Sequence, residues 1–425
     1  MTATLPPRSL PPPGASGGGL PRLQRRLHVL MVSDVCHPRI NGVSTSIETF
    51  GTALGRLGLR ITLVAPDYPG AGTDIDAPVE VIRIPSRAVP LDPEDRLMSW
   101  NELASLDRRL AGADFDLVHI QSPFAAHFAG LRLARRLKLP CIATYHTHFE
   151  EYLFHYVRFV PRGVLRLAAR RLARWQCNAL DAVVVPSQPM AETLRGYGIK
   201  APLHVIPTGL PASQFVRGNG KRFRQQWGIA PTRKLALFVG RAAFEKNIGF
   251  LLEMASIARR REPDLMLVVA GEGPALPALR ERASDLGIDD HVRFVGYLPR
   301  NAGLRDCYAA ADVFVFASRT ETQGLVLLEA LAVGLPVLAL PALGAAEIVA
   351  PGRGTVAAVD DPAGFAAQLC DLLASPQRLA ELGRDALAHA ADWSDDAQAA
   401  RLAFLYRQLQ STPLAANDAL VQPIV

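Results

Sequence analysis

Short, fully apolar segments alternate with longer helical patterns along almost the whole chain, and this alternation constrains the fold more than any other feature. In the first half the expected strands are 28–32, 60–64, 79–84, 117–120, 141–144, 182–185 and 204–206. In the second half they are 235–239, 265–270, 292–295, 313–316, 336–340 and 354–356. Apolar strands separated by helices are typical of parallel sheets covered on both faces. Two successive sets in 425 residues predict an α/β protein with two doubly wound domains.

Glycine, proline and charge patterns predict the domain limits. Residues 1–25 are rich in Pro, Gly and Ser without an apolar core, so we expect a disordered leader rather than a secretory signal. Glycine and proline cluster near residues 211–219, which separates a first domain at 26–213 from a second at 214–392. An amphipathic helix is expected within 393–411, followed by a flexible tail at 412–425.

Composition excludes several other classes of protein. Hydrophobic residues make up 49% of the chain and charged residues 20%, as in a globular protein. The five cysteines form no CxxC pair, which indicates neither a zinc site nor a disulfide framework and fits a reducing, cytoplasmic setting. The apolar stretch 324–348 is interrupted by Gly334-Leu335-Pro336, so we expect a buried helix and strand there rather than a membrane span.

Two carboxylates eight residues apart follow the expected strand 313–316. Glu321 lies in the loop, and Glu329 lies about one turn into the next helix. A helix start suits phosphate because its backbone N–H groups lack helical partners and its dipole is positive, whereas an acid there can accept sugar hydroxyls. An unpaired charge at Glu329, within an apolar run, would be costly, so we expect it to meet a polar ligand. The alternative is one ordinary loop acid and one ordinary helix acid.

Two cations follow the expected strand 235–239 directly. They are Arg241 and Lys246, in the segment Gly240-Arg-Ala-Ala-Phe-Glu-Lys-Asn247. Doubly wound folds bind ligands at the carboxyl ends of their strands, where these side chains are expected. We therefore expect the pair to neutralise a diphosphate, which the guanidinium can bind bidentately. The alternative is a solvated loop in which Lys246 pairs with Glu245.

Two loops of the first half also follow expected strands. The loop after 28–32 contains Asn41-Gly42, a tight turn that would let the backbone approach a ligand closely. The loop after 141–144 contains His146 and His148 beside acids. We expect His146 to orient a sugar hydroxyl. For the Asn41-Gly42 loop, the alternative is an ordinary strand-to-helix loop. For His146, the alternatives are a metal site and a merely structural histidine.

Arginines recur every four residues from position 158, and no acid occurs between Glu151 and Asp181. On a helix this spacing forms nearly one stripe, with apolar residues and Trp175 on the other faces. A cationic amphipathic helix suits an anionic lipid surface; the alternative is a solvated face paired with acids elsewhere. Nucleic acid is disfavoured, because no recognition-helix or aromatic–basic motif accompanies the stripe. The expected membrane residues are Arg158, Arg162, Arg166, Arg170 and Arg174.

Taken in order, these motifs resemble the family 4 retaining glycosyltransferases of the GT-B fold. The resemblance covers roughly residues 27–405 and rests on the Asn41-Gly42 loop, on Ile206-Pro-Thr-Gly209, and on the two charged pairs. Within that family, the segments around His146 and Glu321 look like bacterial diacylglycerol glucosyltransferases. Many members carry Phe where Gln323 stands and Asn where Thr208 stands, although the lipid-linked subgroup shares the Thr.

The resemblance implies two Rossmann-like domains facing a cleft, the first binding the acceptor and the second the nucleotide sugar, with the C-terminal helix crossing back to the first. It implies that Arg241 and Lys246 hold the donor diphosphate, and that Glu321 contacts the hexose beside His146. Glu329 would meet the ribose. The other implied substrate-binding residues are Asn41, Gly42, Gly240, Leu298 (near the base), Gln323, Gly324, Leu325 and Val326.

The expected activity is transfer of a hexose, with glucose from UDP-glucose favoured, to a membrane lipid hydroxyl such as that of diacylglycerol, with retention of configuration. The alternatives are a GDP-mannose-dependent mannosyltransferase, a transferase for a polysaccharide or soluble acceptor, a GT-B epimerase, and a sugar-nucleotide binding protein. The motifs require no metal or other cofactor. We expect a cytoplasmic protein bound peripherally to the inner face of the plasma membrane, and its oligomeric state is left open.

Overall fold

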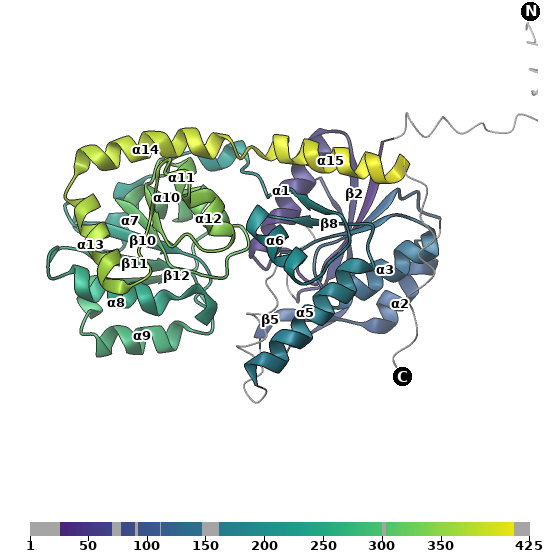
Figure 1. The fold of residues 1–425 in the computed structure, drawn as a ribbon, viewed down its shortest axis with the longest axis horizontal. Coiled ribbons are helices and arrows are strands. Elements are labelled where there is room, and N and C mark those ends of the chain that lie inside the picture. The colour runs from purple at the N-terminus through teal and green to yellow at the C-terminus, as the bar shows by residue number, and fades with distance from the viewer. Residues whose placement is uncertain are drawn as a thin grey trace, which may run out of the picture.

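The structure of the protein is a computed structural model, which describes residues 26–69, 78–89, 92–110, 112–146, 161–299 and 303–411. These residues form two α/β domains that lie side by side, with two long C-terminal helices running across both (Figure 1). The expected leader at 1–25 and tail at 412–425 lie outside the described residues.

The first domain contains a seven-stranded parallel sheet with the order β3-β2-β1-β6-β7-β8-β9. Its strands are β1 (His28–Val32), β2 (Arg60–Pro66), β3 (Glu80–Ile84), β6 (Leu117–Ile120), β7 (Cys141–Thr144), β8 (Ala182–Val185) and β9 (Leu203–Val205). Three of them, β1, β6 and β8, are buried along their whole length, as expected for strands covered on both faces.

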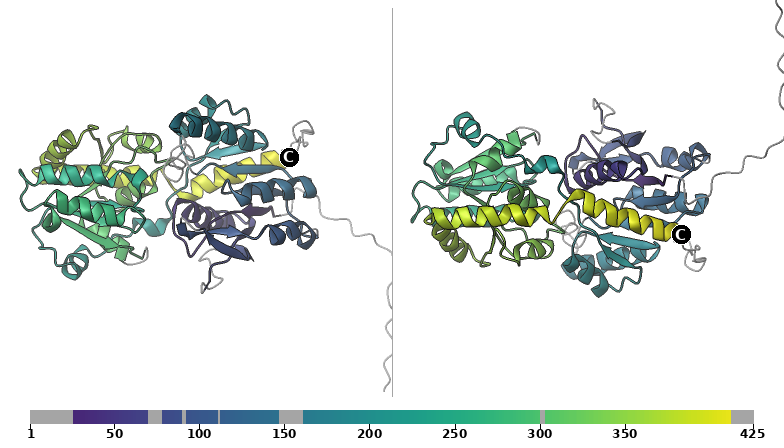
Figure 2. Two further views of the ribbon diagram at one scale, coloured as in Figure 1. Left: turned by 90° about the horizontal axis from the view of Figure 1, so that it is seen from below. Right: turned by 90° about the horizontal axis from the view of Figure 1, so that it is seen from above.

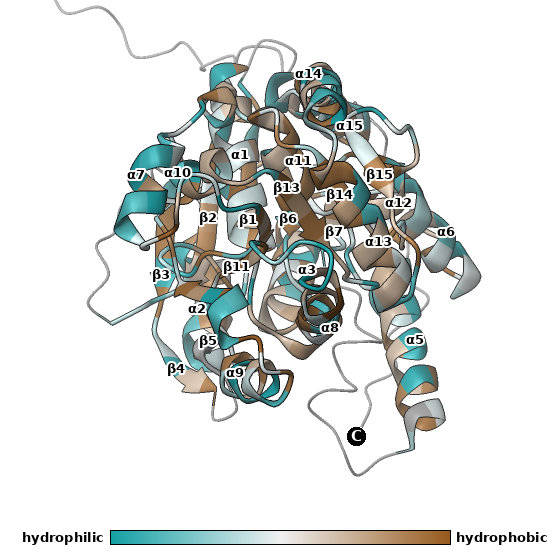
Figure 3. Cartoon of the chain, turned by 90° about the vertical axis from the view of Figure 1, so that its left-hand side faces the viewer, coloured by the Kyte–Doolittle hydropathy of each residue, from teal (hydrophilic) through white to brown (hydrophobic). Residues whose placement is uncertain are grey.

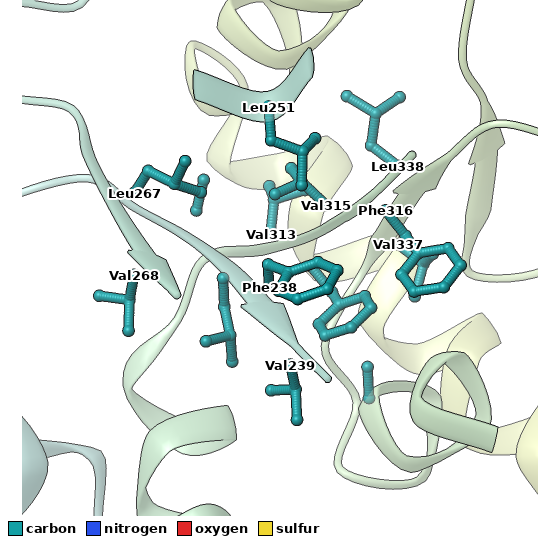
Figure 4. Close-up of a cluster of buried hydrophobic side chains, with 14 of the residues drawn as sticks. Phe238, Val239, Leu251, Leu267, Val268, Val313, Val315, Phe316, Val337 and Leu338 are labelled. Carbon is teal, nitrogen blue, oxygen red and sulfur yellow. The ribbon is translucent and has the colours of Figure 1, made fainter. Parts of the chain in front are cut away.

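The second domain contains a six-stranded parallel sheet with the order β12-β11-β10-β13-β14-β15. Its strands are β10 (Leu235–Val239), β11 (Met266–Ala270), β12 (Val292–Gly296), β13 (Val313–Phe316), β14 (Val337–Ala339) and β15 (Thr355–Ala357). Phe238 of β10 stacks on Phe316 of β13, with ring centroids 6.0 Å apart, in the apolar core seen in Figure 4. The two doubly wound sheets predicted from the alternation are confirmed.

Helices cover both faces of each sheet, so that apolar strands lie inside a more polar shell (Figure 3). Those of the first domain are α1 (Gly42–Arg56), α2 (Trp100–Arg109), α3 (Ala125–Leu137), α5 (Arg162–Asn178) and α6 (Gln188–Gly196). Those of the second are α7 (Gly220–Gln226), α8 (Ile248–Ala258), α9 (Leu276–Asp285), α10 (Gly303–Ala310), α11 (Leu325–Ala332), α12 (Gly344–Val349), α13 (Pro362–Leu373) and α14 (Pro376–Ala391). Short 3₁₀ turns are η2 (Ala212–Phe215), η3 (Phe244–Lys246) and η4 (Asp289–His291).

The last helix, α15 (Asp395–Ser411), leaves the second domain and packs on the first, as Figure 2 shows from two sides. Its buried Tyr406 OH lies 2.7 Å from His119 Nδ1 in β6, and His119 Nε2 lies 2.7 Å from Thr144 Oγ1 in β7. Arg56, at the end of α1, forms ion pairs with Asp395 and Asp396. The expected crossing-back of the C-terminal helix is therefore confirmed.

One part of the fold was not predicted. Strands β4 (Ser86–Val89) and β5 (Asp92–Met98) form an antiparallel hairpin beside the first sheet. Arg87, Arg96 and several acids interrupt its apolar residues, so this segment lacks the continuous apolar run that identifies the other strands.

The apolar stretch 324–348 folds as expected, into α11 and the buried strand β14. Among the residues that the structure describes, no helix is both long and apolar enough to cross a membrane.

Replacing Tyr406 with Phe should destabilise the protein by roughly 1–3 kcal/mol, because it leaves a buried nitrogen of His119 without its partner. Urea unfolding followed by circular dichroism measures this. Phe404→Leu is the matched control: Phe404 lies on the same helix with 60% of its surface exposed, so its substitution should change stability by less than about 0.5 kcal/mol. Equal stability of Tyr406→Phe and the wild type would show that the buried bond does not hold α15 in place.

Candidate functional site

Each sheet has one point at which the strand order reverses. In the first sheet this point lies between β1 and β6, and in the second between β10 and β13. Loops at the carboxyl ends of such neighbouring strands leave in opposite directions and open a crevice, where doubly wound folds bind their ligands. The expected site residues of the second domain follow β10 and β13, so the topology brings their loops to one edge of the sheet.

An ion pair joins those two loops at this edge. Lys246 Nζ lies 2.6 Å from Glu321 Oε2, although the residues are 75 positions apart, and each side chain is about one-fifth exposed. Asn247 Nδ2 donates to Ala317 O at 3.0 Å and ties the same loops together. Lys246 therefore pairs with Glu321 of the other loop, and the solvated pair with its neighbour Glu245 is not formed.

A third loop, which the sequence analysis overlooked, holds the segment that carries Arg241. Glu272 O accepts from Ala242 N at 2.8 Å. A Cβ on Gly271 would lie 1.9 Å from Gly240 O, and one on Gly273 would lie 2.5 Å from Ala242 O, so only glycine permits this close approach. The signal was present in the sequence as Gly-Glu-Gly directly after an expected strand.

Glu329 has a hydrogen-bond partner within the protein. It is buried in α11 with 4% of its surface exposed, and it accepts a hydrogen bond of 2.9 Å from the Tyr308 hydroxyl. The sequence analysis did not identify this donor, which α10 supplies from 21 residues earlier. A carboxylate has several acceptor positions, so this bond leaves Glu329 able to accept others.

The start of α11 is shaped by Gly324, which precedes the helix with a φ of +94°. That left-handed conformation favours glycine. Leu325 and Val326 form the first turn, where backbone N–H groups and the positive end of the helix dipole point outward. Leu298 lies two residues after the end of β12 and packs partly buried against the core of the domain.

The expected tight turn at Asn41-Gly42 is a helix cap instead. Asn41 has extended backbone angles, and its Oδ1 accepts from Val43 N and Ser44 N, each at 3.0 Å. Ser44 Oγ accepts in return from Asn41 N, which completes a capping box. Gly42 is the first residue of α1, and among the residues that the structure describes no atom lies within 4 Å of where a Cβ would be. None of these described neighbours therefore requires glycine at this position.

Asp34 is a second residue that sequence reasoning missed. Its carboxylate accepts from Ser122 Oγ at 2.8 Å, Phe124 N at 3.1 Å and Ala126 N at 2.9 Å. It therefore joins the loop after β1 to the start of α3 across the switch point of the first sheet. Burial raises the pKa of Asp34 to about 6.

His146 lies after β7 and reaches both domains. Its Nε2 lies 3.0 Å from Gln121 Oε1, and its backbone oxygen accepts from Thr322 Oγ1 of the second domain at 2.8 Å. Burial lowers the pKa of His146 to about 4, so the ring is neutral at pH 7 and suits hydrogen bonding to a hydroxyl better than proton donation. The neighbouring His148 lies outside the described residues.

Gln323, which was expected to bind substrate, forms side-chain hydrogen bonds to the linker between the domains. Thr208 N donates to Gln323 Oε1 at 2.9 Å, and Gln323 Nε2 donates to Thr208 O at 2.7 Å. The oxygen and the nitrogen of the amide are thus both hydrogen-bonded within the protein, because the linker between the domains packs against this loop.

The arginine stripe lies on α5, which projects from the lower side of the first domain in Figure 1. Arg166, Arg170 and Arg174 are exposed, and Arg170 lies over the Tyr197 ring at 5.1 Å. Arg158 lies outside the described residues, as does the side chain of Arg162.

Apolar side chains are exposed on the same helix. Val164 and Leu167 are 57% and 54% exposed, and Trp175 is 47% exposed. Trp175 also belongs to an aromatic cluster with Phe128 of α3 and Trp100 of α2, with ring centroids 5.8 and 6.4 Å apart along the cluster. The first domain therefore presents arginines beside exposed apolar and aromatic side chains.

Within the described part of the chain, no three His, Cys, Asp or Glu side chains gather where they could hold a metal ion. All five cysteines are buried and form no disulfide.

Two protein-family models match consecutive parts of this chain. Residues 40–214 match the family model described as Glycosyltransferase Family 4, and residues 219–389 match the one described as Glycosyl transferases group 1. The Alr3699/HepE protein of Anabaena, solved in complex with UDP, aligns with a TM-score of 0.71 and 18% identity over 90% of this chain and all of that one. At this identity the likeness shows the fold, and the expected GT-B architecture is confirmed.

Two relatives cover most of the chain. The alpha-monoglucosyldiacylglycerol synthase of Streptococcus pneumoniae is 34% identical over 322 residues, which are 74% of this chain and 71% of the relative. The GDP-mannose-dependent alpha-(1-6)-phosphatidylinositol monomannoside mannosyltransferase of Mycolicibacterium smegmatis is 31% identical over 394 residues, which are 89% of this chain and 97% of the relative.

Stability should fall as the pH falls from about 6.5 to about 4. Burial lowers the pKa of His119 to about 3 and those of His127 and His146 to about 4. The unfolded chain therefore binds these protons first, and acid favours unfolding in this window. Asp34 makes the opposite contribution to stability as the pH falls, because its raised pKa makes the folded state bind its proton first. The contribution of this one carboxyl is opposed by those of the three imidazoles.

Urea midpoints measured between pH 7.5 and 4.5 test this prediction. His127→Leu should reduce the dependence of the urea midpoint on pH by an amount that corresponds to about one bound proton. His127 is buried against the Phe128 and Trp175 rings, and its Nε2 has no hydrogen-bond partner among the described residues. A midpoint that does not change with pH would contradict the assignment of neutral buried histidines.

Proposed function

Because this chain belongs to glycosyltransferase family 4, we propose that it transfers glucose from UDP-glucose to the hydroxyl of a membrane lipid, with retention of the anomeric configuration. The observation that carries the proposal is the Lys246–Glu321 pair at the switch point of the second sheet. It puts a cation for phosphate and an acid for sugar hydroxyls at one place. The relative from Streptococcus pneumoniae, a glucosyldiacylglycerol synthase by name, supports the choice of glucose and diacylglycerol.

Lys246 suits the donor diphosphate even while it is paired. An ammonium group has three N–H donors, so one bond to Glu321 leaves two for phosphate oxygens. Arg241, on the same loop, would add a bidentate contact, and the first turn of α11 would add backbone N–H groups at Leu325 and Val326. Gly42 at the start of α1 would contact the phosphates from the first domain, since no atom of the described residues lies within 4 Å of where its Cβ would be.

The remaining residues suit the sugar and the base. Glu321 would accept hexose hydroxyls, Glu329 would accept ribose hydroxyls alongside the Tyr308 bond, and Leu298 would contact the base from the loop after β12. A neutral His146 would hydrogen-bond a hydroxyl of the transferred hexose.

In the proposed reaction, the acceptor oxygen forms a bond to the anomeric carbon on the face that the diphosphate leaves. The bond from that carbon to the diphosphate oxygen breaks, and the acceptor proton passes to the departing phosphate. Lys246, Arg241 and the start of α11 stabilise the negative charge that develops on the leaving group. Closure of the two domains around the donor would exclude water.

Mannose from GDP-mannose is the second candidate donor. It is supported by the Mycolicibacterium smegmatis relative, a mannosyltransferase by name, which this chain matches over 97% of its length. Radiolabelled UDP-glucose and GDP-mannose, offered separately with diacylglycerol in mixed micelles, distinguish the two candidates by the lipid product. Transfer from GDP-mannose alone would overturn the choice of glucose, and transfer only to water-soluble acceptors would overturn the lipid.

We also propose that α5 contacts an anionic lipid surface on the cytoplasmic side. Exposed arginines along the helix lie beside the exposed Val164 and Leu167, and Trp175 joins an aromatic cluster at the end of the helix. Aromatic rings of this kind favour the lipid–water interface, and cations near an anionic surface contribute about 1 kcal/mol each.

Lys246→Ala should lower kcat by roughly 10²- to 10³-fold, because it removes a donor aimed at the leaving diphosphate. The loss of the Glu321 contact should cost only about 1 kcal/mol of stability, since both side chains are partly exposed. Initial rates with labelled donor and urea unfolding measure the two effects. Lys221→Ala is the control, since Lys221 is exposed on α7 and outside the loops at the switch point. Near-normal turnover by folded Lys246→Ala would remove the diphosphate role.

Charge reversal of Arg166 and Arg170 to Glu should weaken binding to vesicles containing one-third phosphatidylglycerol by about tenfold or more. Co-sedimentation with such vesicles measures the loss. The matched control reverses Arg384 and Arg407, which are exposed on α14 and α15 and change the net charge equally. Equal losses in both double variants would indicate a general charge effect and contradict a docking role for α5.

A further inference from the structure

The amide of Gln323 pairs with the backbone of Thr208 as one strand residue pairs with another. Thr208 N donates to Gln323 Oε1 at 2.9 Å, and Gln323 Nε2 donates to Thr208 O at 2.7 Å. The two residues are 5% and 4% exposed, so these bonds are shielded from water. Thr208 lies in the segment between β9 and η2, where the chain passes from the first domain to the second.

The same pair is linked to the helix that begins at Gly42. Thr208 Oγ1 donates to Ser46 Oγ at 2.8 Å, and Ser46 lies one turn into α1. Gln323 itself lies between Glu321 and Gly324. A continuous series of buried hydrogen bonds therefore runs from the loop proposed to bind the hexose, through the linker, to the helix proposed to meet the phosphates.

The residue before Gln323 is held by the first domain as well. Thr322 Oγ1 donates to His146 O at 2.8 Å, and Thr322 O accepts from Ser187 Oγ at 2.7 Å. On its other side the loop rests on Gly344, where a Cβ would lie 2.1 Å from Thr322 O. The loop segment between Glu321 and Gly324 thus contacts both domains through Thr322, and it contacts the linker through Gln323.

We propose that Gln323 is a positioning residue, which sets the hexose-binding loop relative to the start of α1 when the domains are closed. This inference rests on the proposed function, since it assigns Gln323 to the same site without contact to the substrate. Removal of the side chain leaves the buried N–H and C=O of Thr208 without partners. Water entering there would shift the loop, and displacements of about 1 Å can cost 10²-fold in rate.

The effect should appear in kcat more than in the donor KM. The proposed donor contacts lie mainly on loops of the second domain, which keep their own bonds, such as Lys246 to Glu321. Gln323→Leu should therefore lower kcat by about 30-fold or more while the KM for UDP-glucose changes by less than about threefold. A residue that only supports folding would lower the amount of active protein and leave the kcat of the folded fraction unchanged.

Gln323→Glu gives a sharper test, because its chemistry can be switched by pH. A neutral carboxyl has a carbonyl acceptor and one O–H donor, so it can reproduce both bonds to Thr208, whereas a carboxylate can only accept and faces the Thr208 carbonyl oxygen. Relative to wild type at each pH, the turnover of Gln323→Glu should rise by about tenfold between pH 8 and pH 5.5. Gln323→Leu should show no such recovery.

The chain contains a matched control at Gln368. Val359 N donates to Gln368 Oε1 at 2.8 Å, and Gln368 Nε2 donates to Ala357 O at 3.1 Å, so this amide also bonds to backbone through both its oxygen and its nitrogen, although to two residues and at an exposed position. It joins α13 to the end of β15 within the second domain and does not reach the first. Gln368→Glu and Gln368→Leu should keep wild-type turnover at every pH.

Small-angle X-ray scattering of the free protein separates this proposal from the proposed function. Gln323→Leu should have a larger radius of gyration than wild type, and Gln323→Glu should be larger at pH 8 and close to wild type at pH 5.5. Identical scattering, with wild-type kcat in Gln323→Leu, would overturn the positioning role. If the scattering differs as expected but the wild type transfers no glucose from UDP-glucose, the positioning role stands and the donor assignment fails.

Discussion

The parallel pairing of β10 with β13 is the constraint on which the rest of the site depends. These strands are neighbours in space but are separated in sequence by two further strands and their helices. Parallel strands end at the same edge, so the loops after them must meet there, and Lys246 comes to lie 2.6 Å from Glu321. An ion pair between loops 75 residues apart is a consequence of strand order, and it would vanish if either strand took another place in the sheet.

A second level of organisation joins the two domains. In the loop that follows β13, Glu321 pairs with Lys246 of the same domain. The next two residues bond outside that domain, Thr322 to His146 and Gln323 to Thr208. The crossover helix α15 adds a buried contact on the far side of the first sheet, through Tyr406 and His119. His119 in turn contacts Thr144, two residues before His146. The linker therefore contacts Gln323, next to the Thr322 that bonds to His146, and the crossover helix is linked through His119 to Thr144, which is close to His146 in sequence.

Much of the fold could be predicted, because apolar strands that are buried on both faces have a distinctive composition. Six of the expected strands, including β1, β10 and β13, begin and end at the predicted residues. The β4–β5 hairpin escaped prediction because charged residues such as Arg87 and Arg96 interrupt its apolar residues. In the site, the sequence identified the charged residues from their place after strands, but it did not identify their partners. Tyr308 beside Glu329 and the capping box at Asn41 depend on local and long-range geometry that no spacing rule contains.

Gln323 shows most clearly what the sequence determines and what the tertiary structure adds. The sequence marked it, with Thr208, as a departure from the pattern of many family members, and the structure shows that these two positions contact each other. The amino-acid sequence by itself determined which segments become strands, where the loops carrying Arg241, Lys246, Glu321 and Glu329 begin, and which surface is basic, because these follow from local periodicity and composition. Only the tertiary structure decided which polar side chains are paired within the protein and with which partners, since a polar group's partner depends on which distant segment packs beside it.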